Sequence, residues 1–335
     1  MKVLVAPLNW GLGHASRCVP LIRRLLDEGH EVVLGGDGES LTLLRKHFPK
    51  LRYTYLAPLN LRYSAGSRQV WAMVKAMPQL ILWAIKDHAM LQAVLREEPF
   101  DQVISDNRFG LYCKQTETVY ITHQLHILLP KGWRWAEGIA SRIHARIYAR
   151  FNKVWVPDYE DPEKSLAGDL SRIPSSFHLS PFTFQYIGPL SRFDISTSRD
   201  IEVSTNYDIV AVLSGLEPHR SLLEQEIVAR YTGKEERVLI VQGLMNRPNT
   251  RIKRGNITMV SYLKDDELIP ALLGAKHIIA RSGYSTIMDL EALGLLKKNN
   301  FQFSIFNFQL ELIPTPGQPE QEYLATYIAQ KSHKA

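Results

Sequence analysis

The hydrophobic and polar positions in the first part of the chain predict strands that alternate with helices. Short apolar runs predict strands at residues 2–6, 31–35 and 51–56. Between them, residues 14–28 and 40–47 carry apolar side chains at helical spacing. Strands that alternate with helices form a parallel sheet with helices on both faces.

The alternation continues to the middle of the chain and starts again after a linker. A long helix is predicted at residues 68–97, with Pro78 as a kink or break because proline lacks a backbone donor. Further strands are predicted at 101–105, 118–122 and 154–156, and a helix at 133–151. Residues 191–205 are rich in Ser, Thr and Asp and predict an interdomain linker.

The second half repeats this architecture with a different sequence. Strands are predicted at 207–213, 238–241, 257–260 and 277–280, and helices at 218–231, 265–273 and 286–293. We therefore expect an α/β protein of two doubly wound, Rossmann-like domains, residues 1–190 and 206–335. We expect the domains to face each other across a cleft at the carboxyl ends of their strands, where such folds bind ligands.

Composition narrows the class of protein. The chain has 335 residues, 45% hydrophobic and 22% charged, which is typical of a globular protein. Its two cysteines, Cys18 and Cys113, lie far apart, which argues against a disulfide framework and fits a reducing cytoplasm. The apolar run after Met1-Lys2 is too short for a signal peptide, and no run reaches membrane-spanning length. The net charge of +6 is compatible with anionic substrates or with a membrane surface.

A glycine-containing loop joins the first strand to the first helix. Gly11 and Gly13 allow a tight turn, and the helix start offers free N–H groups to an anion. A dinucleotide fingerprint is incomplete here, because its third small residue is Ser16, although Asp37 follows at a suitable distance. The helix dipole disfavours the charged form of His14, which keeps it able to accept a proton; the alternative is that it only caps the turn.

The second domain contains two strand–loop–helix segments with polar side chains. In the first, Ser282, Gly283, Ser285 and Thr286 follow Arg281 and are suited to a diphosphate, and Asp289 or Glu291 could bind ribose hydroxyls. The second, residues 313–323, combines a strand, a proline-containing turn and a helix start that carries Gln318, Gln321 and Glu322.

Together with Gly11-Leu12-Gly13-His14, residues 281–294 and 314–323 resemble the glycosyltransferases of the GT-B fold. The similar group contains the peptidoglycan lipid-precursor N-acetylglucosaminyltransferase and the monogalactosyldiacylglycerol synthases (glycosyltransferase family 28). The resemblance implies that Asp289 holds the ribose, that Gln321 and Glu322 contact the sugar, and that Tyr262-Leu263 reads the uracil edge. It also places Ser214, Gly215 and Arg220 in a second phosphate-facing loop, although Arg220 could instead be a solvated residue at a helix start.

The chain departs from that group at several positions. Asp289 stands where the group has Glu, and Ala325 where it has Asn, so the sugar contacts differ. Residues 295–312 are an additional segment with closely spaced phenylalanines, for which we expect a surface hairpin. The resemblance implies no cofactor and no protein-bound metal.

Candidate acceptor-side residues follow two strands of the first domain. Asp106, Asn107 and Arg108 follow one strand and His123 follows the next; Asp106 and His123 are alternatives to His14 as the base. A metal site made of these histidines with His126 and Asp106 has little support from spacing.

One helix has two possible surfaces. The predicted helix 133–151 has an apolar stripe beside three arginines. The stripe comprises Trp135, Ile139, Ile143, Ile147 and Phe151, and the arginines are Arg142, Arg146 and Arg150. With Trp71 and Trp83 it could form a membrane-surface face, but we favour a core stripe with the arginines at its solvated edge. A role in nucleic-acid binding has no motif to support it.

The leading hypothesis is an inverting glycosyltransferase that moves a sugar from a UDP-sugar, such as UDP-N-acetylglucosamine or a UDP-hexose, to a hydroxyl acceptor. The acceptor would be a glycan or lipid-linked, and the enzyme would be cytoplasmic or at the inner face of the membrane. His14 or Asp106 would deprotonate the acceptor, and the helix start at residues 282–286 would stabilise the UDP leaving group. The alternatives are a UDP-sugar 2-epimerase of the same fold and a non-catalytic nucleotide-sugar-binding protein.

Overall fold

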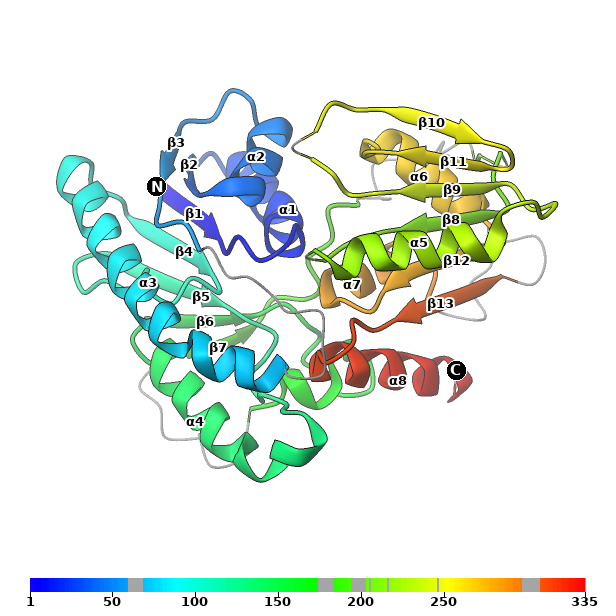
Figure 1. Ribbon diagram of the computed structural model, residues 1–335. Helices are drawn as coiled ribbons and strands as arrows, with labels where there is room; N and C mark the ends of the chain where they lie inside the picture. Colours follow the sequence, from blue (N-terminus) through cyan, green and yellow to red (C-terminus); the bar gives the residue numbers. More distant parts are fainter. Residues whose placement is uncertain are drawn as a thin grey trace. The chain divides into compact units, whose positions relative to one another are not determined.

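The computed structural model divides the chain into two compact units, Met1–Arg192 and Phe193–Ala335 (Figure 1). The structure describes residues 1–59, 69–173, 183–193, 203–204, 206–215, 217–245, 247–296 and 308–334, with the backbone alone at 69–76 and 332–334. Most of the predicted linker, the side chain of Trp71 and residues 297–307 of the additional segment lie outside this description. Within the described ranges, no helix is long and apolar enough to cross a bilayer.

The first unit is built on a parallel sheet of seven strands in the order β3-β2-β1-β4-β5-β6-β7. The strands are β1 Lys2–Pro7, β2 Glu31–Gly36, β3 Tyr53–Tyr55, β4 Gln102–Asp106, β5 Glu117–Ile121, β6 Lys153–Val156 and β7 Thr183–Tyr186. The chain winds outward in both directions from the β1–β4 pair, in which Pro7 is the register partner of Asp106. This pair is the topological switch point, where open α/β sheets bind their ligands.

Helices connect these strands. They are α1 Gly13–Asp27, α2 Gly38–His47, α3 Gln69–Glu97 and α4 Glu137–Tyr148, with short 3-10 helices η1 Lys131–Ala136 and η2 Gly168–Ser171. Right-handed crossovers place α1 and α2 on one face of the sheet and α3 and α4 on the other (Figure 1). The predicted break at Pro78 does not occur, because α3 runs through it. The predicted helix 133–151 is divided into η1 and α4.

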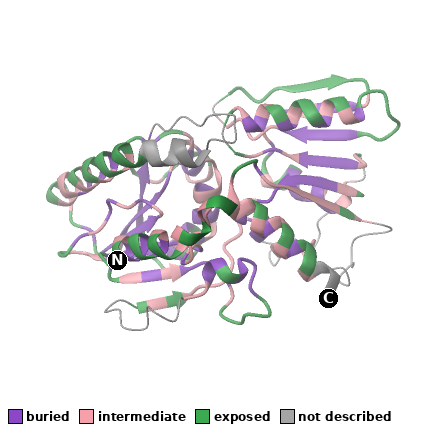
Figure 2. Cartoon of the chain, turned by 60° about the horizontal axis from the view of Figure 1, so that its bottom comes forward, coloured by how far each residue is buried: buried purple, intermediate pink, exposed green. Residues whose placement is uncertain are grey.

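One part of the core of the first unit lies between the sheet and the helices α3 and α4. Leu4, Val103 and Tyr120 of the sheet and Leu91 and Tyr148 of the helices are fully buried in one cluster. Burying each such side chain contributes about 1.5–3 kcal/mol. Figure 2 shows buried residues along the strands and exposed residues on the outer sides of the helices.

The predicted core stripe of α4 is wrong over most of its length. Trp135, Ile139 and Ile143 are exposed, whereas Ile147 is half-buried and Phe151 is buried. The buried side of α4 is instead formed by Ser141, His144, Ala145 and Tyr148.

The second unit has a six-stranded sheet in the order β10-β11-β9-β8-β12-β13. Its strands are β8 Ile209–Val212, β9 Val238–Val241, β10 Arg251–Arg254, β11 Ile257–Val260, β12 His277–Arg281 and β13 Gln309–Ile313. Its helices are α5 His219–Tyr231, α6 Asp265–Gly274, α7 Tyr284–Ala292 and α8 Pro319–Lys334. All strand pairs are parallel except β10–β11. The switch point lies between β8 and β12.

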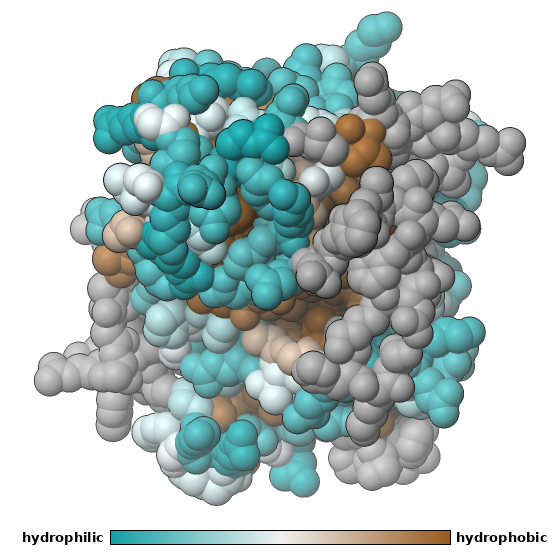
Figure 3. Space-filling view, turned by 90° about the vertical axis from the view of Figure 1, so that its right-hand side faces the viewer, coloured by the Kyte–Doolittle hydropathy of each residue, from teal (hydrophilic) through white to brown (hydrophobic). Residues whose placement is uncertain are grey.

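Two strands of the second unit differ from the prediction. The exposed edge strand β10 was not predicted, because its sequence Arg-Ile-Lys-Arg has no buried face. Residues 309–312 do not form part of a hairpin but belong to β13, which is parallel to β12. Among the residues that Figure 3 colours, hydrophilic ones predominate, and hydrophobic ones gather toward the middle of the view.

Candidate active site

The switch point of the first unit brings together two residues that the sequence offered as alternative bases. His14 lies in the first turn of α1, which starts after a turn where Gly11 adopts a φ of +76°. Asp106 is the last residue of β4. The Nδ1 atom of His14 lies 2.8 Å from Oδ1 of Asp106, although the two residues are 92 positions apart in the sequence. The structure therefore joins them as a His–Asp pair.

A third residue, Arg17, binds to this pair and was not selected from the sequence. Arg17 donates from Nε to Oδ2 of Asp106 at 2.5 Å and from Nη2 to Oδ1 of the same carboxylate. Arg17 is 3% exposed and Asp106 is fully buried. Positions three apart on a helix share a face, so the spacing from His14 to Arg17 is the sequence signal that could have found it.

The charges of the three groups set their protonation. Burial opposes ionisation of Asp106, but Arg17 and His14 outweigh it and hold the pKa of this carboxyl well below its usual range. Burial lowers the pKa of His14 below its ordinary value of 6.5; Asp106 opposes this shift and Arg17 adds to it. At neutral pH the site therefore holds an ionised Asp106 and a neutral His14. Asp106 is too acidic to be the base.

The proton on His14 decides what the site can do. Nδ1 of His14 lies 2.8 Å from Asp106 and 2.8 Å from Nη2 of Arg17, but a single nitrogen cannot donate to one and accept from the other at once. When Nδ1–H donates to Asp106, Nε2 carries the free lone pair. In the described part of the chain, Nε2 has no hydrogen-bond partner. In that tautomer His14 can remove a proton from a hydroxyl group.

Arg108, predicted on the acceptor side, has a different position. Its guanidinium is fully buried and donates to Asp87 at 2.6 and 3.1 Å, to Asp37 at 2.8 Å and to the carbonyl oxygen of Ala57 at 2.7 Å. These partners follow β2 and β3 or lie on α3, so Arg108 ties the carboxyl ends of several strands to a helix. It leaves no surface for an acceptor. Asp37, the possible ribose acid of a dinucleotide site, is engaged in this ion pair.

Asn107 and His123 lie beside the His–Asp pair. Asn107 is the one described non-glycine residue with positive φ, +58°, and its Oδ1 accepts a hydrogen bond from Tyr120 at 2.7 Å. His123 is 5% exposed, with Nδ1 3.3 Å from Nη1 of Arg17. His126 instead lies 3.9 Å from Glu137. Over the described ranges, no three His, Cys, Asp or Glu side chains are arranged to hold a metal ion.

The predicted diphosphate loop of the second unit is braced by its own side chains. Arg281 is 4% exposed and donates to the carbonyl oxygens of Pro314 at 3.0 Å and His219 at 2.7 Å. Ser282 Oγ donates to the carbonyl oxygen of Gln321 at 2.8 Å. These two side chains therefore position the loop. The groups left for a phosphate are the N–H groups of the first turn of α7 after Gly283 and the half-buried hydroxyls of Ser285 and Thr286.

Asp289 and Glu291, the two acidic residues of α7, are half-buried, and each interacts with other groups of the protein. The turn before α8 uses the predicted sugar-binding amides internally. Gln321 Oε1 accepts from the backbone N–H of Thr315 at 2.8 Å, and its Nε2 donates to Gln318 at 2.7 Å. Glu322 is exposed.

A buried arginine stands in the first turn of α5, directly after the loop that follows β8. Arg220 is 8% exposed, forms an ion pair with Glu217 and donates to the carbonyl oxygen of Gln242 at 3.2 Å. It is therefore not the solvated residue considered as an alternative. Gly215 in the same loop has a φ of +95°, and Ser214 is half-buried. Leu263 is buried and Tyr262 is half-buried, so the backbone of this segment is the part that a uracil ring could reach.

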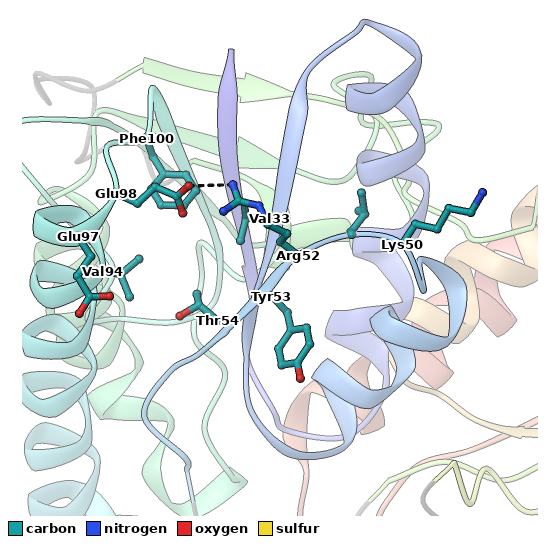
Figure 4. A pocket seen from close by; sticks show the side chains of 10 residues that line it. Val33, Lys50, Arg52, Tyr53, Thr54, Val94, Glu97, Glu98 and Phe100 are labelled. Carbon is teal, nitrogen blue, oxygen red and sulfur yellow. Dashed lines mark hydrogen bonds and ion pairs between the residues drawn. The ribbon is translucent and has the colours of Figure 1, made fainter.

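A cavity of about 420 Å³ lies at the opposite, amino-terminal edge of the first sheet. Its lining includes Arg52 and Glu98, which face each other in Figure 4. Hydrogen bonds from Lys2, which has the larger effect, and from Arg52 hold the pKa of Glu98 below its ordinary value. The carboxylate of Glu98 is therefore held in ion pairs with Lys2 and Arg52 and is not available as a general base.

Known proteins resemble the whole chain. No protein-family model matches it. A relative from Methanosarcina acetivorans, named an uncharacterised glycosyltransferase, is 22% identical over 99% of this chain and 84% of its own length. Spinosyn forosaminyltransferase SpnP is 13% identical with a TM-score of 0.53, covering 100% of this chain and 95% of that one. Phytolacca americana UGT2, in complex with UDP-2-fluoro-glucose and pterostilbene, is 13% identical with a TM-score of 0.56, covering 98% and 83%.

These similarities confirm two of the predictions. The fold class is α/β with two Rossmann-like units, as in GT-B glycosyltransferases. The predicted enzyme class, glycosyltransferase, is confirmed by the relatives, which are named glycosyltransferases; the structural neighbours show the fold. The narrower resemblance to the peptidoglycan and galactolipid group is not confirmed and stays a prediction.

Proposed function

We propose that this protein is an inverting glycosyltransferase that moves a sugar from a UDP-sugar to a hydroxyl group of an acceptor. The observation that carries the proposal is the His14–Asp106 pair at the switch point of the first unit, 2.8 Å from nitrogen to oxygen. In support, Phytolacca americana UGT2 binds a UDP-sugar analogue.

The proposed mechanism uses His14 as the general base. Asp106 accepts the Nδ1–H of His14 and so leaves Nε2 free to accept the proton of the acceptor hydroxyl. As that O–H bond weakens, the oxygen attacks the anomeric carbon and the bond from this carbon to the UDP oxygen breaks. Attack from the side opposite the leaving group inverts the anomeric centre. The imidazolium that forms on His14 is stabilised by the ionised Asp106.

The second unit would bind the nucleotide. We assign the diphosphate to the first turn of α7, where backbone N–H groups and the helix dipole favour negative charge, with Ser285 and Thr286 as additional donors. We assign the ribose to Asp289 and the uracil edge to the backbone at Tyr262-Leu263. Arg281 and Ser282 would act indirectly by fixing the loop.

Calorimetry combined with a product assay tests this proposal. The protein should bind UDP and should release UDP from a UDP-sugar in the presence of a hydroxyl acceptor. The product should have the anomeric configuration opposite to that of the donor, as read by NMR. Absence of UDP binding, a retained configuration, or conversion of the UDP-sugar into an epimer without any acceptor would each contradict the proposal.

A further inference from the structure

Asn107 directly follows Asp106 at the end of β4, and its backbone has an unusual conformation. Its φ of +58° lies in the left-handed region, which within the described part of the chain is otherwise adopted only by glycines. Asparagine tolerates this region better than most residues, but glycine adopts it without strain. The turn itself therefore needs no side chain at this position, and the role of the Asn107 amide lies in its contacts.

A buried hydrogen-bond chain fixes one end of this amide. The hydroxyl of Tyr120 on β5 donates to Oδ1 of Asn107 at 2.7 Å, and Nε2 of His144 on α4 lies 3.1 Å from the same hydroxyl oxygen. Tyr120 is fully buried and His144 is buried, so water does not compete for these bonds. Burial lowers the pKa of His144 to about 4, so its ring is neutral at neutral pH and can donate to or accept from the hydroxyl, depending on the tautomer.

The other end of the amide is left for a ligand. Asn107 is half-buried, and in the described part of the chain its Nδ2 has no hydrogen-bond partner. With the amide turned by half a rotation, Nδ2 donates to Tyr120, the Tyr120 hydroxyl donates to His144, and Oδ1 becomes the free atom. In both arrangements the protein holds one atom of the amide and leaves the other one unbonded.

We infer that the free end of the Asn107 amide binds a second hydroxyl group of the acceptor, next to the hydroxyl that His14 deprotonates. The inference rests on the proposed function, because that function places the reacting hydroxyl at His14. Asp106 is bonded to His14, Asn107 is the next residue, and adjacent Cα atoms are about 3.8 Å apart, so one sugar ring is wide enough to meet both side chains. The acceptor is then a molecule with neighbouring hydroxyls, such as a pyranose, and Tyr120 is a positioning residue that acts through Asn107.

The charges around Asn107 favour an uncharged hydroxyl over an anion. Arg17 and Arg108 already donate to carboxylates, Arg17 to Asp106 and Arg108 to Asp37 and Asp87. A phosphate or carboxylate at the amide would therefore lie beside the ionised Asp106 while both arginines are engaged. A hydroxyl group both donates and accepts, so it fits either orientation of the amide.

Titration followed by NMR tests this inference without turnover. The full chain is prepared with isotope-labelled asparagine, and the side-chain signals of Asn107 are identified by their absence in Asn107→Gly. The probes are the methyl glycosides of glucose, galactose and mannose, which carry neighbouring hydroxyls, and tetrahydropyranylmethanol, which has the same ring and a single hydroxyl. With or without saturating UDP, at least one glycoside should shift the Asn107 signals and bind at least about threefold more tightly than tetrahydropyranylmethanol, the scale of one further hydrogen bond.

Two variants separate binding from folding. Asn107→Gly keeps the backbone conformation, so its thermal unfolding should stay close to that of the wild type, while its affinity for the glycoside should fall to that for tetrahydropyranylmethanol. Tyr120→Phe removes the anchor of the amide, so the Asn107 signals should move toward those of a free amide and the glycoside affinity should fall about two- to tenfold. The matched control is Tyr186→Phe, which removes a hydroxyl that donates to Ser171 at 2.8 Å and should leave both readouts unchanged.

The possible outcomes are distinct. No shift of the Asn107 signals by any glycoside, equal affinities for the glycoside and tetrahydropyranylmethanol, or an unchanged affinity in Asn107→Gly would each overturn the inference. Unchanged signals and affinity in Tyr120→Phe would overturn the positioning role of Tyr120. Failure of the proposed function is seen separately, as a lack of UDP release, because these titrations contain no UDP-sugar.

Discussion

The His–Asp pair predicts different consequences for two substitutions that should impair catalysis alike. His14→Ala removes the proposed base and leaves the Arg17–Asp106 ion pair intact. Asp106→Asn keeps the shape of the side chain but replaces an acceptor by an amide, whose N–H can donate to Nδ1 and drive the proton of His14 to Nε2. Either change should lower kcat by about 10²–10⁴-fold, the usual contribution of a general base.

The stabilities of the two variants should differ strongly. Asp106 is fully buried, and its partner Arg17 is 3% exposed. Breaking such a pair leaves a buried guanidinium uncompensated, which costs about 3–5 kcal/mol. His14→Ala removes one hydrogen bond from a side chain that is 17% exposed, a cost of about 0.5–1.5 kcal/mol. Because the two residues act as one unit, the double variant should have a kcat no lower than the worse single variant.

UDP release from a UDP-sugar and urea unfolding measure these two effects separately. Asp106→Asn should be assayed at a temperature where circular dichroism shows that it is folded. A kcat of His14→Ala within tenfold of the wild type would refute the role of His14 as base. A free energy of unfolding for Asp106→Asn equal to that of His14→Ala would refute the buried ion pair.

Three further predictions concern neighbouring residues. Since a neutral His14 is the active form and its pKa is lowered, the rate should fall only as the pH drops through a value below 6.5. Arg17→Gln removes a positive charge that lowers this pKa, so the acidic limb of the pH–rate profile should move to higher pH. Arg17→Lys keeps the charge and should return the acidic limb largely to its wild-type position. Arg108→Met should lower the free energy of unfolding by about 3–5 kcal/mol, because it leaves buried carboxylates unpaired, whereas a loss of acceptor affinity at full stability would contradict its bracing role. Asp289→Ala should weaken UDP binding in calorimetry by about 1.5–3 kcal/mol and Glu291→Ala should not; the reverse result would show that the register of the motif is wrong.

Acid unfolding should also follow from the site. The pKa of Asp106 is depressed in the folded protein, so the stabilisation that its ionised form provides is present above its unfolded value of 3.8. It is lost progressively as the pH falls below that value and through the lower pKa of the folded protein. The difference in unfolding free energy between the wild type and Asp106→Asn should therefore stay constant from neutral pH to about pH 5 and shrink in stronger acid.

The sequence predicted the elements whose burial is regular. Strands such as β1 and β9 are continuous apolar runs, and the intervening helices have a clear apolar period, so local pattern was sufficient. The strand β10 has no buried residue to produce a pattern. The exposed Trp135 and Ile139 were assigned to the core because periodicity reveals a stripe but not what covers it.

The sequence identified His14 and Asp106 singly but could not pair them. Their contact depends on the sheet order that places β4 next to β1 across a long crossover. For a related reason Arg17 was not selected and Arg108 was placed on the acceptor side. An arginine is usually exposed, and these two are buried only because carboxylates from distant segments, Asp106 for one and Asp37 with Asp87 for the other, meet them in the folded chain.

The most direct test of the central claim is UDP release by the wild type and by His14→Ala across a panel of UDP-sugars with hydroxyl acceptors. We predict that at least one donor gives acceptor-dependent UDP release by the wild type and that His14→Ala reduces this rate at least about a hundredfold. We also predict that His14→Ala leaves UDP affinity unchanged in calorimetry. No UDP release from any donor, or equal rates for the two proteins, would contradict the assignment of His14 as the base of a glycosyltransferase.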